Sequence, residues 1–153
     1  MSYKIDVKIK YVSSKIGQEI TPPFYATSGS AGMDLSACIH QPVVLKPGEK
    51  TIIPTGIAIQ LPSNQYVALI FARSGLGIKH GITMSNGVGV IDSDYTGEIM
   101  CGLINLGSKS YTIQPGDRIA QMVFMPVAVA SLTLVDELID TERGIGGLGS
   151  TGK

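Results

Sequence analysis

The 153-residue sequence has no excess charge of either sign, because twelve Lys and Arg residues balance twelve Asp and Glu residues. Nucleic acids and anionic membrane surfaces attract proteins through excess positive charge, so the balance argues against both as partners. The longest apolar stretch, MVFMPVAVASLTLV, contains Pro126 and is shorter than the roughly 18 to 20 residues that span a bilayer. We therefore expect a soluble, cytoplasmic protein that meets any phosphate at a local site.

Cysteine and histidine are scarce as well. Cys38 and Cys101 lie far apart and belong to no CxxC pattern, so a metal or redox site is not indicated. The simpler interpretation is two buried thiols in a reducing compartment. The histidines, His40 and His80, form no Ser-His-Asp triad that can be assembled from the sequence.

Short β-branched runs separated by Gly and Pro are abundant. Residues 1–10 alternate apolar and charged side chains, which predicts a half-buried strand and not a signal peptide. Similar runs recur in VVLKPGEKTIIPTGIAIQLP, YVALIFA, GVGVID, GEIMCGLINLG and RIAQMVFMPV. This pattern predicts an all-β barrel or sandwich. RSGLGIKHG is the one helix candidate, and we expect a turn or two at most, because Gly75 and Gly77 each cost about 1 kcal/mol against Ala.

The chain length suits one domain, and the C-terminal residues have a different composition. Five of the last ten residues are glycine, so we expect a β domain over 1–140 and a flexible, Gly-rich arm over 141–153. GLGSTGK, residues 147–153, has the glycine and lysine spacing of a P-loop. A P-loop needs a strand before it and a helix after it, and no such pattern surrounds these residues, so the similarity is a coincidence of glycine spacing.

Three stretches could carry chemistry. In ARSGLGIKHG, Arg73 and Ser74 stand before glycines, so a guanidinium, a hydroxyl and unobstructed N–H groups could meet one anion. A loop with a solvated Arg is an equal alternative. In QPGDRIAQ, Arg118 and Gln121 follow a Pro-Gly turn, and a strand with one polar face would explain them equally well. Asp34 in AGMDLSA is weak evidence alone, since Asp beside Gly is usually a turn or cap residue.

A fourth stretch, NGVGVIDSDYTGE over residues 86–98, is a candidate for catalysis. Asn86-Gly87 is compatible with a hairpin turn, after which Asp92 would end a strand and could act as general base toward water. In an extended chain Asp94 would share the face of Asp92, and Tyr95 would point the opposite way. The alternative is an ordinary pair of surface acids.

Five stretches of the chain, from about residue 22 to residue 152, resemble in order and spacing the five motifs of the trimeric deoxyuridine triphosphatases. They are AGMDLSA, ARSGLGIKHG, NGVGVIDSDYTGE, PGDRIAQMVF and RGIGGLGSTG. The resemblance implies a jelly-roll-like β-barrel homotrimer. It implies hydrolysis of dUTP to dUMP and pyrophosphate, which keeps uracil out of DNA and supplies dUMP for thymidylate synthesis. It also implies Mg²⁺ held mainly by the substrate phosphates, without a dedicated protein cage.

The resemblance assigns roles to individual residues. Asp92 would activate the attacking water. Uracil would bind Asn86 and the backbone of Val90 and Ile91, with Met100 as a further contact. Tyr95 would lie against the deoxyribose and exclude a 2′-hydroxyl.

The same resemblance assigns the triphosphate to a second group of residues. Arg73, Ser74, Gly75 and Gln121 would hold the phosphates. Arg118 would be a supporting partner, and Asp34 would order either the metal's hydration shell or a neighbouring Arg. The arm would close over a neighbouring subunit's site through Arg143, Leu148, Ser150 and Thr151.

Three positions depart from the family pattern. Leu148 stands where an aromatic residue usually caps the uracil, and stacking on a base is worth about 1 to 3 kcal/mol, so we expect weaker closure. Met33 replaces a common Tyr and Ala72 a common Pro, and neither touches the expected chemistry.

Two alternatives stay open at this point. One is a dCTP deaminase, although those enzymes need a glutamate that acts on the cytosine amine and lack the IDSDY sequence. The other is a non-catalytic nucleotide-binding trimeric scaffold, since a shared fold does not confer function.

Overall fold

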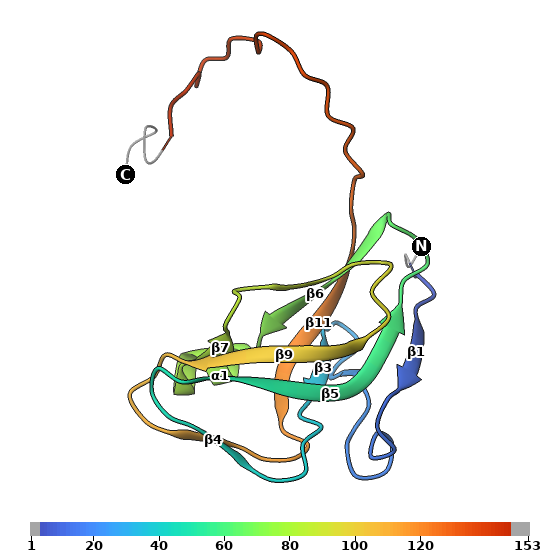
Figure 1. The fold of residues 1–153 in the computed structure, drawn as a ribbon, viewed down its shortest axis with the longest axis vertical. Helices are drawn as coiled ribbons and strands as arrows, with labels where there is room; N and C mark the ends of the chain where they lie inside the picture. Colours follow the sequence, from blue (N-terminus) through green and yellow to red (C-terminus); the bar gives the residue numbers. More distant parts are fainter. Residues whose placement is uncertain (1–3, 148–153) are drawn as a thin grey trace.

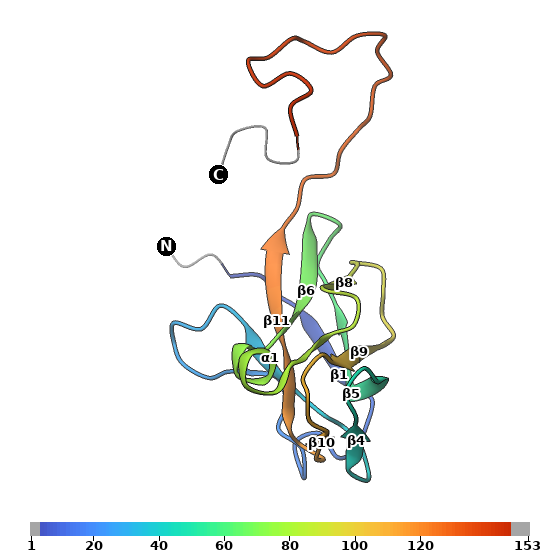
Figure 2. The same ribbon diagram turned by 90° about the vertical axis from the view of Figure 1, so that its left-hand side faces the viewer.

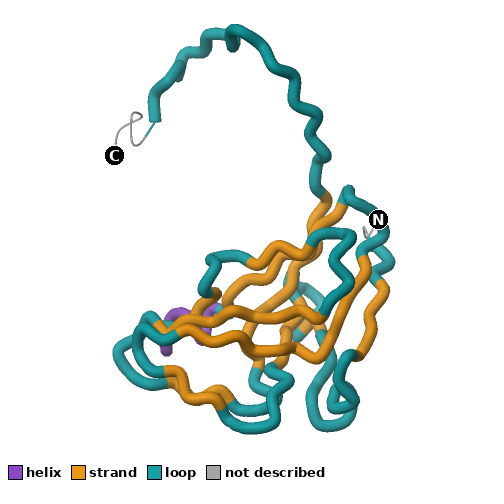
Figure 3. The backbone as a smooth tube through the Cα atoms, in the orientation of Figure 1, coloured by secondary structure: helices purple, strands orange, loops and turns teal. Residues whose placement is uncertain are grey.

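The computed structural model describes residues 4–147, and these form eleven strands and one short helix (Figures 1 and 3). The strands of the first half are β1 (Lys8–Tyr11), β2 (Phe24–Tyr25), β3 (Met33–Ser36), β4 (Val43–Leu45), β5 (Lys50–Gln60) and β6 (Tyr66–Ala72). Helix α1 (Ser74–His80) is followed by β7 (Ile82–Met84), β8 (Gly89–Ile91), β9 (Glu98–Asn105), β10 (Tyr111–Ile113) and β11 (Arg118–Pro126). The prediction of an all-β fold with at most one short helix is confirmed.

Two larger sheets make up the body of the molecule. Their strand orders are β1-β5-β9-β7 and β2-β3-β11-β6-β8, and β10 pairs with β4 in a separate ribbon. Neighbouring strands run antiparallel, as in the central pairs β5–β9 and β11–β6. The two sheets lie face to face (Figures 1 and 2). No strand pairing in residues 4–147 joins them, so the fold is jelly-roll-like but not closed into a true barrel.

Strand β9 shows how the sequence pattern builds the core. Ile99, Cys101 and Leu103 alternate along the strand and are fully buried between the sheets, while Met100 between them is exposed. This is the period of two that the sequence displays. Cys38 and Cys101 are both free and buried, which confirms their interpretation as buried thiols.

Helix α1 tolerates its two glycines because its C-terminus is held from outside. Gly81 ends the helix in the left-handed conformation, with φ 72°, and its N–H donates to the Gly77 carbonyl at 3.0 Å. The Gly81 carbonyl accepts from Leu106 N–H at 2.8 Å. The bond from Leu106 joins the end of the helix to the loop after β9.

The chain leaves the sheets after Pro126, and residues 127–147 run away from the body without helix or strand (Figures 1 and 2). This departure comes before residue 141, where the sequence predicts the arm to begin; the arm's role stays a prediction. The segment leaves a series of apolar side chains exposed, namely Val127, Val129, Leu132, Leu134, Val135, Leu138 and Ile139. Among the described residues, no helix is both long enough and apolar enough to cross a membrane.

Candidate active site

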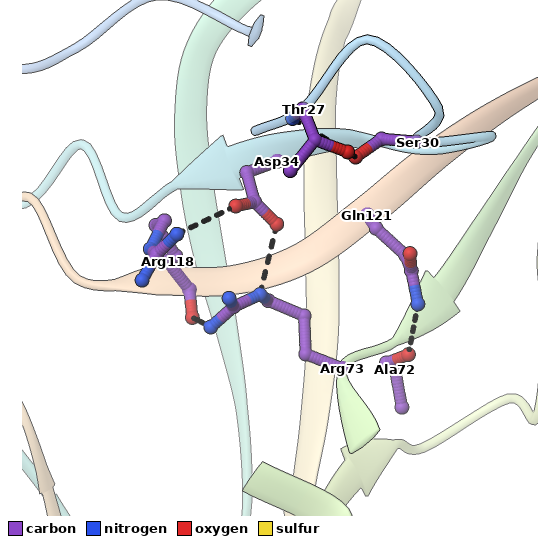
Figure 4. Close-up of polar contacts among 7 residues, drawn as sticks. All are labelled: Thr27, Ser30, Asp34, Ala72, Arg73, Arg118 and Gln121. Atoms are coloured by element: carbon purple, nitrogen blue, oxygen red, sulfur yellow. Dashed lines mark hydrogen bonds and ion pairs between the residues drawn. The ribbon is translucent and has the colours of Figure 1, made fainter. Parts of the chain in front are cut away.

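A buried carboxylate between two arginines is the centre of the first group of predicted site residues (Figure 4). Asp34 on β3 is only 8% exposed. Its Oδ1 accepts from Arg73 Nε at 2.8 Å, and its Oδ2 accepts from an Arg118 terminal nitrogen at 3.0 Å. A second Arg73 nitrogen donates to the Arg118 carbonyl at 3.3 Å. Asp34 therefore contacts both arginines, and its role in the reaction stays a prediction.

Strand register explains why these residues meet. Asp34 on β3 lies opposite Gln121 on β11, and Gln121 lies opposite Phe71 on β6. Arg73 directly follows the last residue of β6, so its side chain can reach back across β11 to Asp34. Residues from three distant motifs are thus neighbours across one sheet.

The Gln121 amide is held beside this ion pair. Its Nε2 donates to the Ala72 carbonyl at 3.0 Å (Figure 4). A Cβ added at Gly32 would lie only 2.7 Å from the Gln121 Oε1, so a side chain at residue 32 would collide with the amide. Gly32 therefore gives the amide its space.

These residues line a cleft of about 360 Å³. The lining includes Asp34, Arg73, Ser74, Gly75, Gln121, Phe71, Val123, Ala26, Ser30, Ala31 and Gly32. Ser74 and Gly75 form the first turn of α1, which has no side-chain cap, so its first N–H groups could donate to an anion in the cleft. A larger hollow of about 760 Å³ contains none of the predicted site residues and is lined largely by apolar and aromatic side chains, so the smaller cleft is the candidate for phosphate binding.

The loop from Ala26 to Ser30, before AGMDLSA, was not predicted as part of the site. Ala26 and Ser30 line the cleft, and the Thr27 and Ser30 hydroxyls lie 3.0 Å apart (Figure 4). The only available signal was its position next to AGMDLSA, because short polar residues look the same in any surface turn.

The second group of predicted residues surrounds β8 and the loop that follows it. Val90, Asp92, Tyr95 and Met100 are exposed, and Ile91 is half-buried. Asn86 lies in the exposed turn before β8. These side chains are free to meet a ligand.

Two expectations for this segment are wrong. Strand β7 pairs with β9 while β8 pairs with β6, so the Asn86-Gly87 turn carries the chain between sheets and does not close a hairpin of adjacent strands. After β8 the chain turns instead of staying extended, because Tyr95 N–H donates to the Asp92 carbonyl at 3.2 Å. The face-sharing argument for Asp94 and Tyr95 therefore does not apply.

One chain does not bring the two groups together. Strand β8 and strand β3 are separated by β6 and β11, which is three spacings of about 4.8 Å each. Along β6, Ala68 lies opposite Ile91, and Arg73 is five residues further, or about 16 Å in an extended strand. Asp92 follows Ile91 in the direction away from Arg73, and the cleft lining includes neither Asn86, Asp92 nor Tyr95.

The residues predicted on the arm are only partly described. Arg143 is exposed, and its Nε donates to the Gly146 carbonyl at 2.9 Å. Leu148, Ser150 and Thr151 lie outside the described residues. Within residues 4–147, no group of three or more His, Cys, Asp and Glu side chains could hold a metal ion.

Comparison with known proteins decides the family. The dUTPase family model matches residues 18–152. The chain belongs to the dUTPase family.

The similar proteins extend over the whole chain. Deoxyuridine 5′-triphosphate nucleotidohydrolases of Enterobacter sp. (strain 638) and Pectobacterium carotovorum are 53% and 51% identical to it over 153 residues, covering 100% of this chain and 99% of each relative.

Two solved dUTPases are similar in structure. The dUTPase of Staphylococcus bacteriophage 80alpha with dUPNHPP has a TM-score of 0.85 and 28% identity, covering 97% of this chain and 99% of that one. A mutant dUTPase from phage phi11 of S. aureus, described as revealing the coordination of a structural Mg(II) ion, has a TM-score of 0.75 and 25% identity, covering 86% and 97%. The predicted jelly-roll-like fold is that of the dUTPase family.

Proposed function

We propose that this chain hydrolyses dUTP to dUMP and pyrophosphate, through water attack on the α-phosphate. The observation that carries the proposal is full-length identity above 50% with a deoxyuridine 5′-triphosphate nucleotidohydrolase. The product dUMP would feed thymidylate synthesis, and removal of dUTP would keep uracil out of DNA. Buried free thiols fit a reducing compartment, which supports action in the cytoplasm.

The cleft supports triphosphate binding through positioned positive charge. Asp34 accepts from Arg73 Nε and the Arg118 carbonyl accepts from one terminal nitrogen, which leaves the other terminal nitrogen of Arg73 for phosphate oxygens. Ser74, Gly75 and Gln121 add a hydroxyl, backbone N–H groups and an amide to the same cleft. A neutral protein can thus bind a polyanion, because the required charge is local.

The loop after β8 supports base, sugar and water recognition. Asp92 would accept a proton from water as the water oxygen bonds to the α-phosphorus and the bond to pyrophosphate breaks. Asn86 and the backbone of Val90 and Ile91 would bind uracil, and Met100 would contact the nucleotide. The Tyr95 ring would lie against the deoxyribose.

A magnesium ion fits this site only as a partner of the substrate. Both oxygens of Asp34 are engaged by arginines, whose positive charge disfavours a cation beside them. We propose that Mg²⁺ is held mainly by the triphosphate oxygens, where it would neutralise charge that develops on the phosphates.

We further propose a homotrimer in which each active site combines residues of different subunits. Asp92 and the Asp34 cleft lie apart in one chain, so a second copy would bring its Asp92 loop to the cleft. Exposed apolar residues such as Ile52 and Met100, on adjacent strands of the four-stranded sheet, support burial against another copy. The arm from residue 141 would close over a neighbour's site through Arg143, Leu148, Ser150 and Thr151.

A nucleotide panel tests the function. Pyrophosphate release is measured with dUTP, dCTP, dTTP and UTP in the presence of Mg²⁺, together with ammonia release from dCTP. Release from dUTP alone is the expected result. Ammonia from dCTP would identify a deaminase, and no reaction with any nucleotide would identify a binding scaffold.

A matched pair of variants tests the role of Asp92. Asp92→Asn should lower kcat for dUTP by about 10² to 10⁴, because the general base is lost while dUTP binding remains. Asp94→Asn removes a carboxylate two positions away and should stay close to wild type. Near-normal turnover in Asp92→Asn would refute the assigned role.

A further inference from the structure

Gly97 lies next to the hydroxyl end of the Tyr95 ring. A Cβ added at Gly97 would be 2.7 Å from the Tyr95 hydroxyl oxygen, 2.8 Å from Cζ and 3.1 Å from Cε2. Separations under about 3 Å between such atoms lie well inside the optimal contact distance of carbon atoms. The Tyr95 ring therefore occupies space that exists only because residue 97 has no side chain.

The Tyr95 ring is also held at its far end. The Tyr95 hydroxyl donates to the Glu98 carbonyl at 2.8 Å. Glu98 is itself fixed, because its carboxylate accepts from Gly56 N–H at 2.8 Å and its backbone pairs with Ala58 on β5. The side chain is nonetheless 45% exposed, so part of the ring stays open to a ligand.

We propose that Gly97 is a positioning residue that sets sugar selectivity through Tyr95. Because residue 97 has no side chain, the Tyr95 ring lies close to the backbone of the turn between Asp92 and Glu98, where its hydroxyl donates to the Glu98 carbonyl. A methyl group at residue 97 lifts the ring, breaks that hydrogen bond and moves the surface that faces the sugar.

This inference rests on the proposed function, in which Tyr95 lies against the deoxyribose and leaves no room for a 2′-hydroxyl. A ring that is displaced closes the site less sharply around the sugar. The kcat/KM for UTP then rises relative to that for dUTP. Asp92 precedes the turn, so its position should not change.

The test compares kcat/KM for dUTP and UTP in wild type and Gly97→Ala. The ratio of the two values should fall about tenfold or more, the scale of discrimination set by small steric differences in a pocket. Gly97 does not have the positive φ that only glycine adopts readily, so alanine is compatible with the backbone. An unchanged ratio would overturn the proposal.

Controls separate this effect from a loss of folding. Thr112→Ala, at an exposed position of the β10–β4 ribbon that carries none of the proposed site residues, should leave the ratio unchanged. In a Tyr95→Ala background, Gly97→Ala should change the ratio no further. If Gly97→Ala unfolds but the double variant folds, the steric contact is confirmed; if both unfold, glycine is needed for the backbone and the proposal fails. Wild type that does not release pyrophosphate from dUTP would refute the proposed function instead.

Discussion

At the scale of single residues, the arrangement around Asp34 shows how a weak motif position can organise a site. Asp34 is buried, and its cost of desolvation is offset because both carboxylate oxygens accept from guanidinium groups. The pair of arginines would repel each other without it. The residue type was predictable, but its partners depend on strand neighbours far away in the sequence.

Cys101 gives a prediction about stability and pH. Burial raises the pKa of the Cys101 thiol from 9.0 to about 12. Between these values the unfolded chain binds fewer protons at this group than the folded chain, so the free energy of unfolding falls as pH rises. The contribution is at most about 1.4 kcal/mol per pH unit.

Urea unfolding measured from about pH 8 to about pH 10.5 in wild type and Cys101→Ala checks this sign. Wild type should lose more stability with rising pH than the variant does, since other titrating groups are common to both. Equal slopes would show that the thiol does not contribute.

At the scale of elements, the sequence predicts strands and their buried faces better than it predicts their partners. The alternation in β9 and the short, glycine-containing α1 follow from local pattern. The Asn86-Gly87 turn was predicted correctly as a turn and wrongly as a hairpin, because turn chemistry does not specify which sheet the next strand joins. Arg73, Ser74 and Gln121, which line the cleft, were named from the family resemblance. For Ala26 and Ser30, which line it too, the only signal was their position next to AGMDLSA.

The pairing of β3 with β11 places Gly32 beside Gln121, and a variant can test whether Gly32 makes room for the Gln121 amide. Gly32→Ala should displace the Gln121 amide, because the added Cβ would be 2.7 Å from its Oε1, and the bond to the Ala72 carbonyl would be lost. We expect kcat/KM for dUTP to fall about ten- to hundredfold, the scale of a misplaced active-site group.

A double-mutant cycle identifies the route of this effect. If Gly32 acts through Gln121, Gly32→Ala should add little in a Gln121→Ala background. Fully additive losses would instead indicate a general disturbance of the sheet.

At the scale of the whole molecule, the proposed trimer would account for two features of the single chain. The proposed catalytic carboxylate and the phosphate cleft belong to different ends of the five-stranded sheet, and the segment after Pro126 exposes a series of apolar side chains. No local pattern in the sequence predicts this separation, because it follows from strand order.

Mixing two inactive variants tests shared sites. Arg73→Ala and Asp92→Asn subunits are each expected to be nearly inactive alone. After subunit exchange at equal amounts, a random mixture of trimers should recover up to about a quarter of wild-type activity, since each mixed ring forms one intact site.

The control for this experiment mixes Asp92→Asn with Asp92→Ala, which cannot form an intact site. Light scattering should show trimers in every sample. No recovery in the first mixture, despite subunit exchange, would place each active site within one chain.

The separation of Asp92 from the Asp34 cleft also has a genetic consequence. In a cell that carries one normal and one defective copy of this gene, chains from both copies would enter the same rings. A chain that lacks its carboxylate would disable a site whose arginines come from a normal neighbour. Its own intact arginines would form a complete site with the carboxylate of a normal neighbour. The activity that remains in such a cell would therefore depend on how normal and defective subunits combine in each ring, and not only on how many normal chains are made.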